Sequence, residues 1–289
     1  MRIKVGLLSF ILSIIFLHVP VVQGAEPVVA AKKILKAPVI DGNDQDWTDI
    51  KAVAVRVAPA VNSDNKNHTG TIDVTIKAAN DGENIYFLVQ WPDDTKDDTH
   101  KVMIWNSDVE MYEAGNDLED RLALGIDMGG DFTGCMLGGT EYKADIWHWK
   151  AFRSQTAGIA HDKMHIVSFQ QMPMAKKHAS RDGKKEVWIA RPSDAGDKLY
   201  KSQRLIDKKA DREPKYLVTP SPQGSIADVK TGAVWADSTW TLEIKRKLST
   251  GHVDDVVFVP GEKYKASVAV FNHTGDDHHS KAAFTLKIQ

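Results

Sequence analysis

Short stretches in which apolar and polar residues alternate run through most of this chain, and they constrain its fold more than any other feature. Residues 71–77, Thr-Ile-Asp-Val-Thr-Ile-Lys, alternate cleanly, and residues 84–91, Asn-Ile-Tyr-Phe-Leu-Val-Gln-Trp, form a denser apolar run. Between them, Asp81-Gly82-Glu83 has the composition of a hairpin turn. A period of two indicates strands that bury one face.

Similar runs recur along the rest of the chain, at residues 121–127, 144–149, 185–190, 233–235, 240–245, 265–271 and 282–288. None of them is followed by a convincing amphipathic helix, which disfavours a parallel α/β fold. The sequence therefore predicts an all-β protein, folded as an antiparallel β-sandwich. Residues 172–222 are rich in Lys, Arg, Asp and Pro and break the pattern, so we expect a long polar insertion or excursion there.

Residues 1–24 have the features of a Sec-type signal peptide. Arg2 and Lys4 precede an almost wholly apolar run, and Val22 and Gly24 supply the small residues of a cleavage site. An uncleaved anchor is the alternative, because the run approaches the ~20 residues of a membrane span. Cleavage would leave residues 25–289 as one periplasmic domain without a transmembrane span.

The charge balance and the absent motifs argue against several classes of protein. With 37 basic and 39 acidic residues, the chain is not a basic nucleic-acid binder. It has no Gly-x-Ser-x-Gly or His-Glu-x-x-His motif, which argues against a hydrolase. Acidic stretches at residues 41–46 and 93–98 lack the ligand spacing of an EF-hand loop, so we interpret them as solvated turns.

The segment around the only cysteine is the densest in side chains that could hold a cofactor. Residues 131–140 read Asp-Phe-Thr-Gly-Cys-Met-Leu-Gly-Gly-Thr. Met136 offers a thioether, one of the axial ligands that haem iron accepts. The alternative is that Met136 only fills a gap in the core, as methionine often does.

Residues 144–153, Ala-Asp-Ile-Trp-His-Trp-Lys-Ala-Phe-Arg, follow closely. On a strand, Trp147 and Trp149 face one side and His148 the other. The two indoles could line a haem slot, with Lys150 and Arg153 pairing with the propionates. Alternatively, they are ordinary sandwich core, and Asp145, His148 and Lys150 face solvent.

A second polar segment, residues 273–281, lies between two strong strands and reads His-Thr-Gly-Asp-Asp-His-His-Ser-Lys. A solvated hairpin loop is the simplest interpretation. His278 and His279 are adjacent, so on a strand they point to opposite faces, and they lack the partners of a zinc set.

Together these segments resemble the haem-binding domain of ethylbenzene dehydrogenase gamma subunits, which also occurs in the small subunits of selenate reductase and dimethylsulfide dehydrogenase. Residues 133–140 and 144–153 carry most of the resemblance. Weaker matches are Ile40-Asp-Gly-Asn-x-x-x-Trp47 and the segments 235–248, 267–271 and 280–286. The resemblance covers most of residues 34–288, apart from much of the excursion at 172–222.

The resemblance implies a β-sandwich that carries a b-type haem, a cytochrome b, whose iron is held by a Met and a Lys. By position these are Met136 and Lys281, with His279 and then His278 as alternatives to the lysine. It also implies electron transfer to a redox partner protein, with molybdopterin and iron–sulfur subunits as candidates, and no catalysis by this chain alone.

Some proteins of this family instead carry Cys-x-x-Cys-His at the position of Cys135. Here Gly138 and Gly139 replace the second Cys and the His, so two thioether links to haem are excluded. The competing hypothesis is a haem-free carbohydrate-binding or adhesion sandwich. It requires Trp147 and Trp149 to be exposed on a concave face, where they could stack on sugar rings.

Overall fold

The structure is a computed structural model that describes residues 25–61 and 63–289. Within these residues it contains strands and three short 3-10 helices (Gln45–Trp47, Gln155–Ala157 and Ser225–Ala227) but no α-helix. The all-β prediction is confirmed. The predicted signal peptide, residues 1–24, lies outside the described residues. Nowhere in the described part does a helix have the length and apolar character needed to span a membrane.

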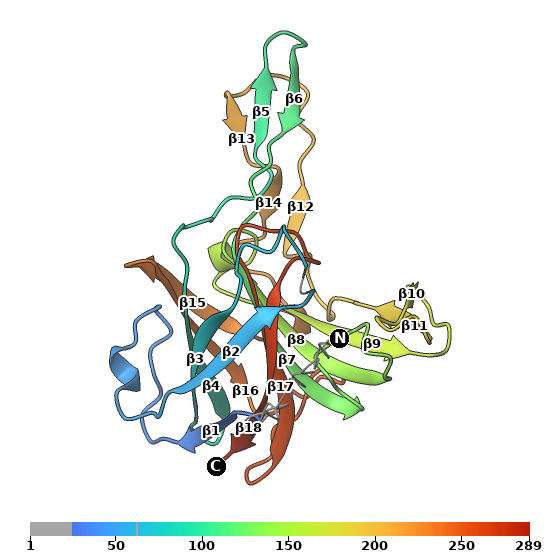
Figure 1. The fold of residues 1–289 in the computed structure, drawn as a ribbon. Helices are drawn as coiled ribbons and strands as arrows, with labels where there is room; N and C mark the ends of the chain where they lie inside the picture. Colours follow the sequence, from blue (N-terminus) through green and yellow to red (C-terminus); the bar gives the residue numbers. More distant parts are fainter. Residues whose placement is uncertain (1–24, 62) are drawn as a thin grey trace, which may run out of the picture.

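Most strands join one large sheet that folds into two facing halves (Figure 1). One half runs in the order β1 (Val28–Lys33), β3 (Ile72–Asn80), β4 (Asn84–Pro92), β16 (Thr239–Lys247) and β15 (Lys230–Ala236). The other half runs in the order β18 (Ser280–Ile288), β17 (Lys263–Phe271), β7 (Arg121–Gly130), β8 (Tyr142–Lys150), β9 (His161–Ser168), β11 (Glu186–Ala190) and β10 (Lys176–Ala179).

The strand pairs are antiparallel, as predicted, except for those of one strand, which make the large sheet mixed. Strand β1 pairs in parallel with both β18 and β3. Strand β2 (Val53–Pro59) also lies between β18 and β3, and it pairs antiparallel with both. The alternation of apolar residues shows which face of a strand is buried and carries no information about the direction of its partner.

The core lies between the two halves and is rich in aromatic rings. The centroid of Phe87 on β4 lies 5.8 Å from that of Trp147 on β8. The ring of Trp149 lies 5.8 Å from Trp91 on β4 and 5.0 Å from Trp240 on β16. These edge-to-face contacts fix β8 against the opposite half. They leave the other face of β8 free to line a separate site.

The predicted excursion divides into two parts. Strands β10 and β11 extend the main sheet beyond β9. Residues further along form an arm that projects from the body (Figure 1). The arm consists of the short strands β12 (Tyr200–Ser202), β13 (Arg212–Glu213) and β14 (Tyr216–Val218) together with β5 (Met103–Asn106) and β6 (Met111–Ala114).

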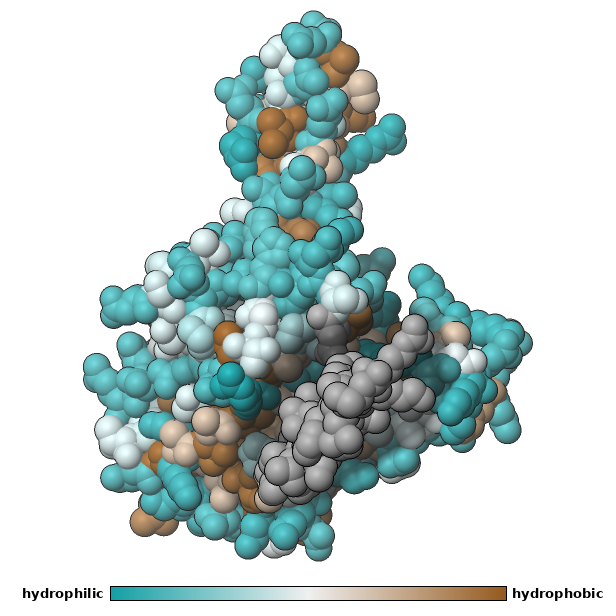
Figure 2. Space-filling view, in the orientation of Figure 1, coloured by the Kyte–Doolittle hydropathy of each residue, from teal (hydrophilic) through white to brown (hydrophobic). Residues whose placement is uncertain are grey.

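Strands β5 and β6, which precede β7 and form part of the arm, were not expected from the sequence. Figure 2 shows apolar side chains gathered on the arm against a largely hydrophilic surface. The exposed apolar residues of these segments include Ile104, Met111 and Ile206.

Candidate cofactor site

A cavity opens on the face of the β17–β7–β8–β9 sheet that points away from the core, and the start of β18 contributes to it. Strand alternation separates the two faces. On β7, Leu122 and Leu124 belong to the core, whereas Ala123 and Gly125 line the cavity. The cavity measures about 260 Å³, slightly below the range of roughly 300–1,000 Å³ of small-molecule sites.

Small side chains form the floor of this cavity. In the sheet register Lys281 lies opposite Ala269, Ala269 opposite Ala123, and Ala123 opposite His148. A Cβ atom added to Gly125 would lie 2.8 Å from Ser267 Oγ, so no larger residue fits there without a shift. A floor without bulky groups leaves a flat surface between the lysine and the histidine.

The Gly-rich loop between β7 and β8 covers the floor. Phe132 is buried in a small apolar cluster beneath the loop, and Met136 and Leu137 pack against that cluster. Gly134 adopts a φ of +63°, and a Cβ atom there would lie 3.0 Å from Ser267 Cβ. This glycine therefore allows the loop to approach the sheet closely.

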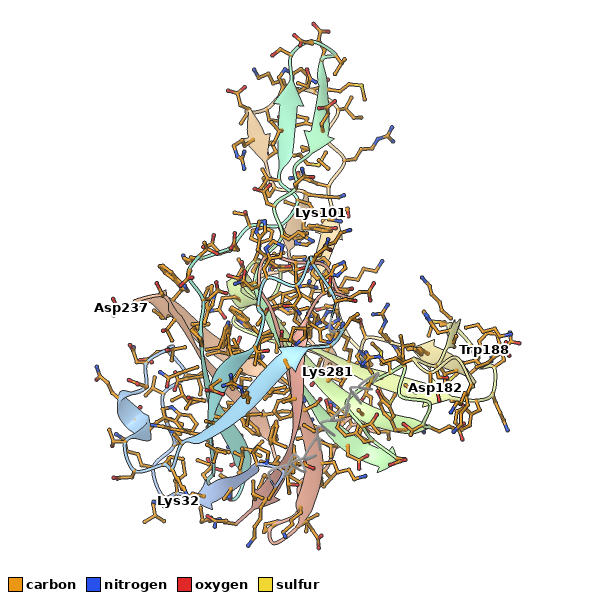
Figure 3. All side chains as sticks on the ribbon, in the orientation of Figure 1. Lys32, Lys101, Asp182, Trp188, Asp237 and Lys281 are labelled. Carbon is orange, nitrogen blue, oxygen red and sulfur yellow. The ribbon has the colours of Figure 1, made fainter. Side chains whose placement is uncertain are left out.

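Met136 from this loop and Lys281 from β18 line the same cavity, although they are far apart in the sequence. Figure 3 shows Lys281 in the middle of the body. Its Nζ atom donates a hydrogen bond to the carbonyl oxygen of Gly134, at 2.7 Å. Burial lowers the pKa of Lys281, and a nearby Cys135 acts in the opposite direction. The fold thus places the two predicted ligands at one cavity, where burial lowers the pKa of the lysine amine.

The two histidines before Lys281 differ in position. His279 lines the cavity, and burial together with Lys281 lowers its pKa to about 4. His278 does not line the cavity, and its Nδ1 atom lies 2.9 Å from Asp64 Oδ2. Of the two alternatives to Lys281, only His279 faces the predicted site.

Basic side chains line one wall of the cavity; they are His148, Lys163, His165, Arg181 and Arg191. Burial lowers the pKa of Lys163 to about 8 and that of His165 to about 3. His148 is buried, burial lowers its pKa well below the usual value, and its Nε2 atom has no hydrogen-bond partner among the described residues. Such a wall suits an anionic group.

Acidic groups also border the cavity, at Asp276 and Asp277. Asp276 forms an ion pair with Arg121, whose guanidinium also bonds to the carbonyl oxygen of Thr274. Although burial raises the pKa of Asp276, Arg121 and Lys163 lower it to about 2. The cavity therefore combines an apolar floor and cover with a charged rim.

Four residues that the sequence placed at the site lie elsewhere. Trp147 and Trp149 are fully buried in the core, because alternation puts them on the face of β8 opposite His148. The Nζ atom of Lys150 lies 2.7 Å from His161 Nδ1, and Arg153 forms an ion pair with Glu119; neither residue lines the cavity. The expected aromatic wall is thus part of the core.

The burial of both indoles also removes the feature on which the carbohydrate hypothesis depended, since neither ring is exposed on a concave face. The expectation that Asp145, His148 and Lys150 face solvent was wrong as well, because all three are buried. Lys163 and His165 were missed because residues 161–168 had not been recognised as a strand. Their i, i+2 spacing was the available signal.

Comparison with known proteins gives one extensive match. A family model described as ethylbenzene dehydrogenase matches residues 44–283. No curated protein matches the chain.

Two solved structures show a distant likeness. A protein from Bacteroides uniformis assigned to carbohydrate binding is 10% identical, with a TM-score of 0.42; the match covers 92% of this chain and 100% of that one. A family 9 carbohydrate-binding module from Caldicellulosiruptor kristjanssonii, in complex with glucose, is 12% identical, with a TM-score of 0.40; the match covers 91% of this chain and 95% of that one. At these values the likeness carries no inference about a ligand.

Proposed function

This chain belongs to the ethylbenzene dehydrogenase family, and from that premise we propose that it is a periplasmic electron-transfer protein, or an electron-transfer subunit of a molybdenum oxidoreductase, that binds haem b. The observation that carries the proposal is that Met136 and Lys281 line one cavity. Haem b, when bound, supplies reversible one-electron transfer at its iron.

The residues of the cavity suit such a group. A thioether and an amine are both donors that haem iron accepts in this family, and here they come from the loop above the floor and from the strand at its edge. The small residues Ala123, Gly125 and Ala269 give an apolar floor for a flat macrocycle. Lys163 and Arg191 can pair with the propionates.

Lys281 must lose a proton before it can bind a metal. An ordinary lysine, with a pKa of about 10.4, pays about 4.6 kcal/mol for this at pH 7. Burial lowers the pKa of Lys281 and so reduces this cost. The amine must also give up its hydrogen bond to the Gly134 carbonyl oxygen.

Haem loading tests the proposal directly. Purified protein should bind haemin with about one equivalent per chain and develop a Soret band. Met136→Ala and Lys281→Ala should each shift that band and weaken binding about tenfold or more, because each loses an iron bond worth more than about 1.4 kcal/mol. Met174→Ala and Lys36→Ala are matched controls, since Met174 is 83% exposed and the Lys36 side chain is 87% exposed.

Two results would contradict the proposal. Wild-type protein that develops no Soret band with haemin would refute haem binding. Binding that survives both Met136→Ala and Lys281→Ala unchanged would refute the ligand assignment. His279→Ala then decides between Lys281 on β18 and His279 in the preceding loop. His278 is not a candidate, because only His279 of the two adjacent histidines lines the cavity.

Proteins that exchange electrons need a docking surface for their partner. The partners we propose are the molybdopterin and iron–sulfur subunits of an oxidoreductase, in keeping with the family.

A further inference from the structure

Three buried aspartates meet on the core side of the same half-sheet. Asp145 on β8 and Asp162 on β9 share this face, and Asp255 reaches them from the loop between β16 and β17. Each is no more than 5% exposed. One oxygen from each carboxylate lies within 4.8 Å of the other two. Oxygen ligands bound to one Ca²⁺ at about 2.4 Å can be no more than about 4.8 Å apart, so this spacing fits a single ion.

The hydrogen bonding of these carboxylates is incomplete. No N–H group or hydroxyl of the described residues donates to either oxygen of Asp162, which is fully buried, and its carboxyl meets only the carboxyls of Asp145 and Asp194. Asp145 Oδ1 and Asp255 Oδ1 are also unpartnered. Buried polar atoms are normally satisfied, and unsatisfied ones call for an explanation such as an ion. The Asp162 carboxyl therefore faces only other carboxyls, so a proton or a cation must lie between them, and the test below distinguishes the two.

The charge balance leads to the same conclusion. Arg246 is paired with Asp145 and lies 3.4 Å from Asp255 Oδ1, which leaves Asp162 without a cation of its own. A fourth carboxyl, Asp194, is 7% exposed, and its Oδ2 atom is unpartnered as well. Buried carboxylates without compensating charge are strongly unfavourable unless they are neutralised or coordinate a metal.

We propose that Asp145, Asp162 and Asp255 bind one calcium ion that ties β8, β9 and the β16–β17 loop together. The available ligands are all oxygens, which suits Ca²⁺ and other hard cations rather than zinc or copper. Asp194 contacts Asp162 but is not among the three carboxylates that meet the distance criterion. The site is structural, because it lies on the face of β8 opposite the cofactor cavity and reaches no part of it.

A neighbouring group competes with this assignment and supplies the control. Asp228, His252 and Asp255 also meet the distance criterion. However, His252 Nδ1 already bonds Asp228 Oδ2 at 2.8 Å, and the His252 side chain is 44% exposed. The outer group, Asp228 with His252, therefore has a hydrogen bond of its own without an ion. The inner group, Asp145 with Asp162 and Asp255, keeps carboxyl oxygens that no N–H group or hydroxyl bonds.

The test uses full-length protein stripped with EDTA. Added CaCl₂ should raise the Tm by about 5 °C or more at a hundredfold excess over Kd. It should also leave one Ca²⁺ per chain after desalting, measured by mass spectrometry of the metal. TbCl₃ should give sensitised luminescence, because the Trp147 ring lies 4.9 Å from the Arg246 guanidinium that borders the site.

Asp162→Asn should abolish the calcium-dependent rise in Tm and the terbium signal, whereas Asp228→Asn should keep both. Wild-type protein with the same Tm in EDTA and in CaCl₂, and with no bound metal, would overturn the proposal even if the Asp162 variant failed to fold. If Asp228→Asn lost calcium binding and Asp162→Asn kept it, the ion would belong to the outer group, and this result would overturn the proposal too.

Discussion

The two faces of the β8–β9 pair carry opposite types of side chain, basic on one face and acidic on the other, because alternate residues of the same two strands point to opposite sides. The outer face presents His148, Lys163 and His165 to the cavity. The inner face presents Asp145 and Asp162 to the core. Asp162 and Lys163 are adjacent in sequence and end on opposite sides of one sheet. A single strand pair can thus place basic side chains at a cavity and carboxyl groups in the core because side chains alternate.

On the inner face, removal of Arg246 should lower the free energy of unfolding more than any other change. Arg246→Met leaves Asp145 and Asp255 buried without their guanidinium, and it should lower the free energy of unfolding by about 3–5 kcal/mol. Urea unfolding in EDTA measures this. The control is Arg56→Met, whose exposed pair with Asp73 at 3.1 Å should contribute no more than about 1 kcal/mol. Equal losses in the two variants would contradict the account.

The division between core and cavity can be tested with one residue from each side. Trp147→Ala should cost about 3–5 kcal/mol in the free energy of unfolding, because a large fully buried side chain is lost. Met136 is only partly buried, so Met136→Ala should cost less, but it should change the haem spectrum. Chemical denaturation and absorption spectra should therefore rank the two variants in opposite orders. If one variant had the larger effect in both assays, the core face and the cavity face of β8 would not act separately.

Lys163 should make the stability of the cofactor-free protein depend on pH. Burial lowers the pKa of Lys163 from 10.5 to about 8, so as the pH rises the folded protein loses this proton before the unfolded chain does. Stability should therefore increase from pH 8 towards pH 10.5, by about 1–2 kcal/mol given the partial exposure of the side chain. Lys163→Met should be more stable below pH 8 and should lose this rise. A wild-type profile that falls over this interval would contradict the assignment.

The smallest effect is expected at the edge of the outer face. His278 is held by Asp64 outside the cavity, so His278→Ala should leave haemin affinity and the Soret maximum unchanged. His279→Ala, at the adjacent position, provides the comparison. A shifted Soret band in the His278 variant would mean that the loop before β18 rearranges when the cofactor binds.

Alternation in the sequence was sufficient to predict an all-β chain and the opposite orientations of His148 and Trp147. Alternation alone could not show which of the two faces of β8 becomes the core, because both faces carry apolar residues. That depends on the partners Phe87 and Trp240, which come from distant strands. The parallel pairing of β1 and the arm formed by β5, β6 and β13 also depend on contacts that no local pattern records.

The two sites differ in how much of them the sequence could reveal. Met136 and Lys281 were predicted through the resemblance to a family, and the fold places both at one cavity. The aspartate cluster has no local motif, since its three members come from two strands and a loop. Only the tertiary structure brings these carboxylates together.

The most direct test of the central claim is the haem content of the protein isolated from its natural host. The account predicts about one haem b per chain that acidified organic solvent extracts completely, because Gly138 and Gly139 exclude the second thioether link and the histidine of a covalent site. Protein isolated without haem, or with haem that remains attached through Cys135 after extraction, would contradict it.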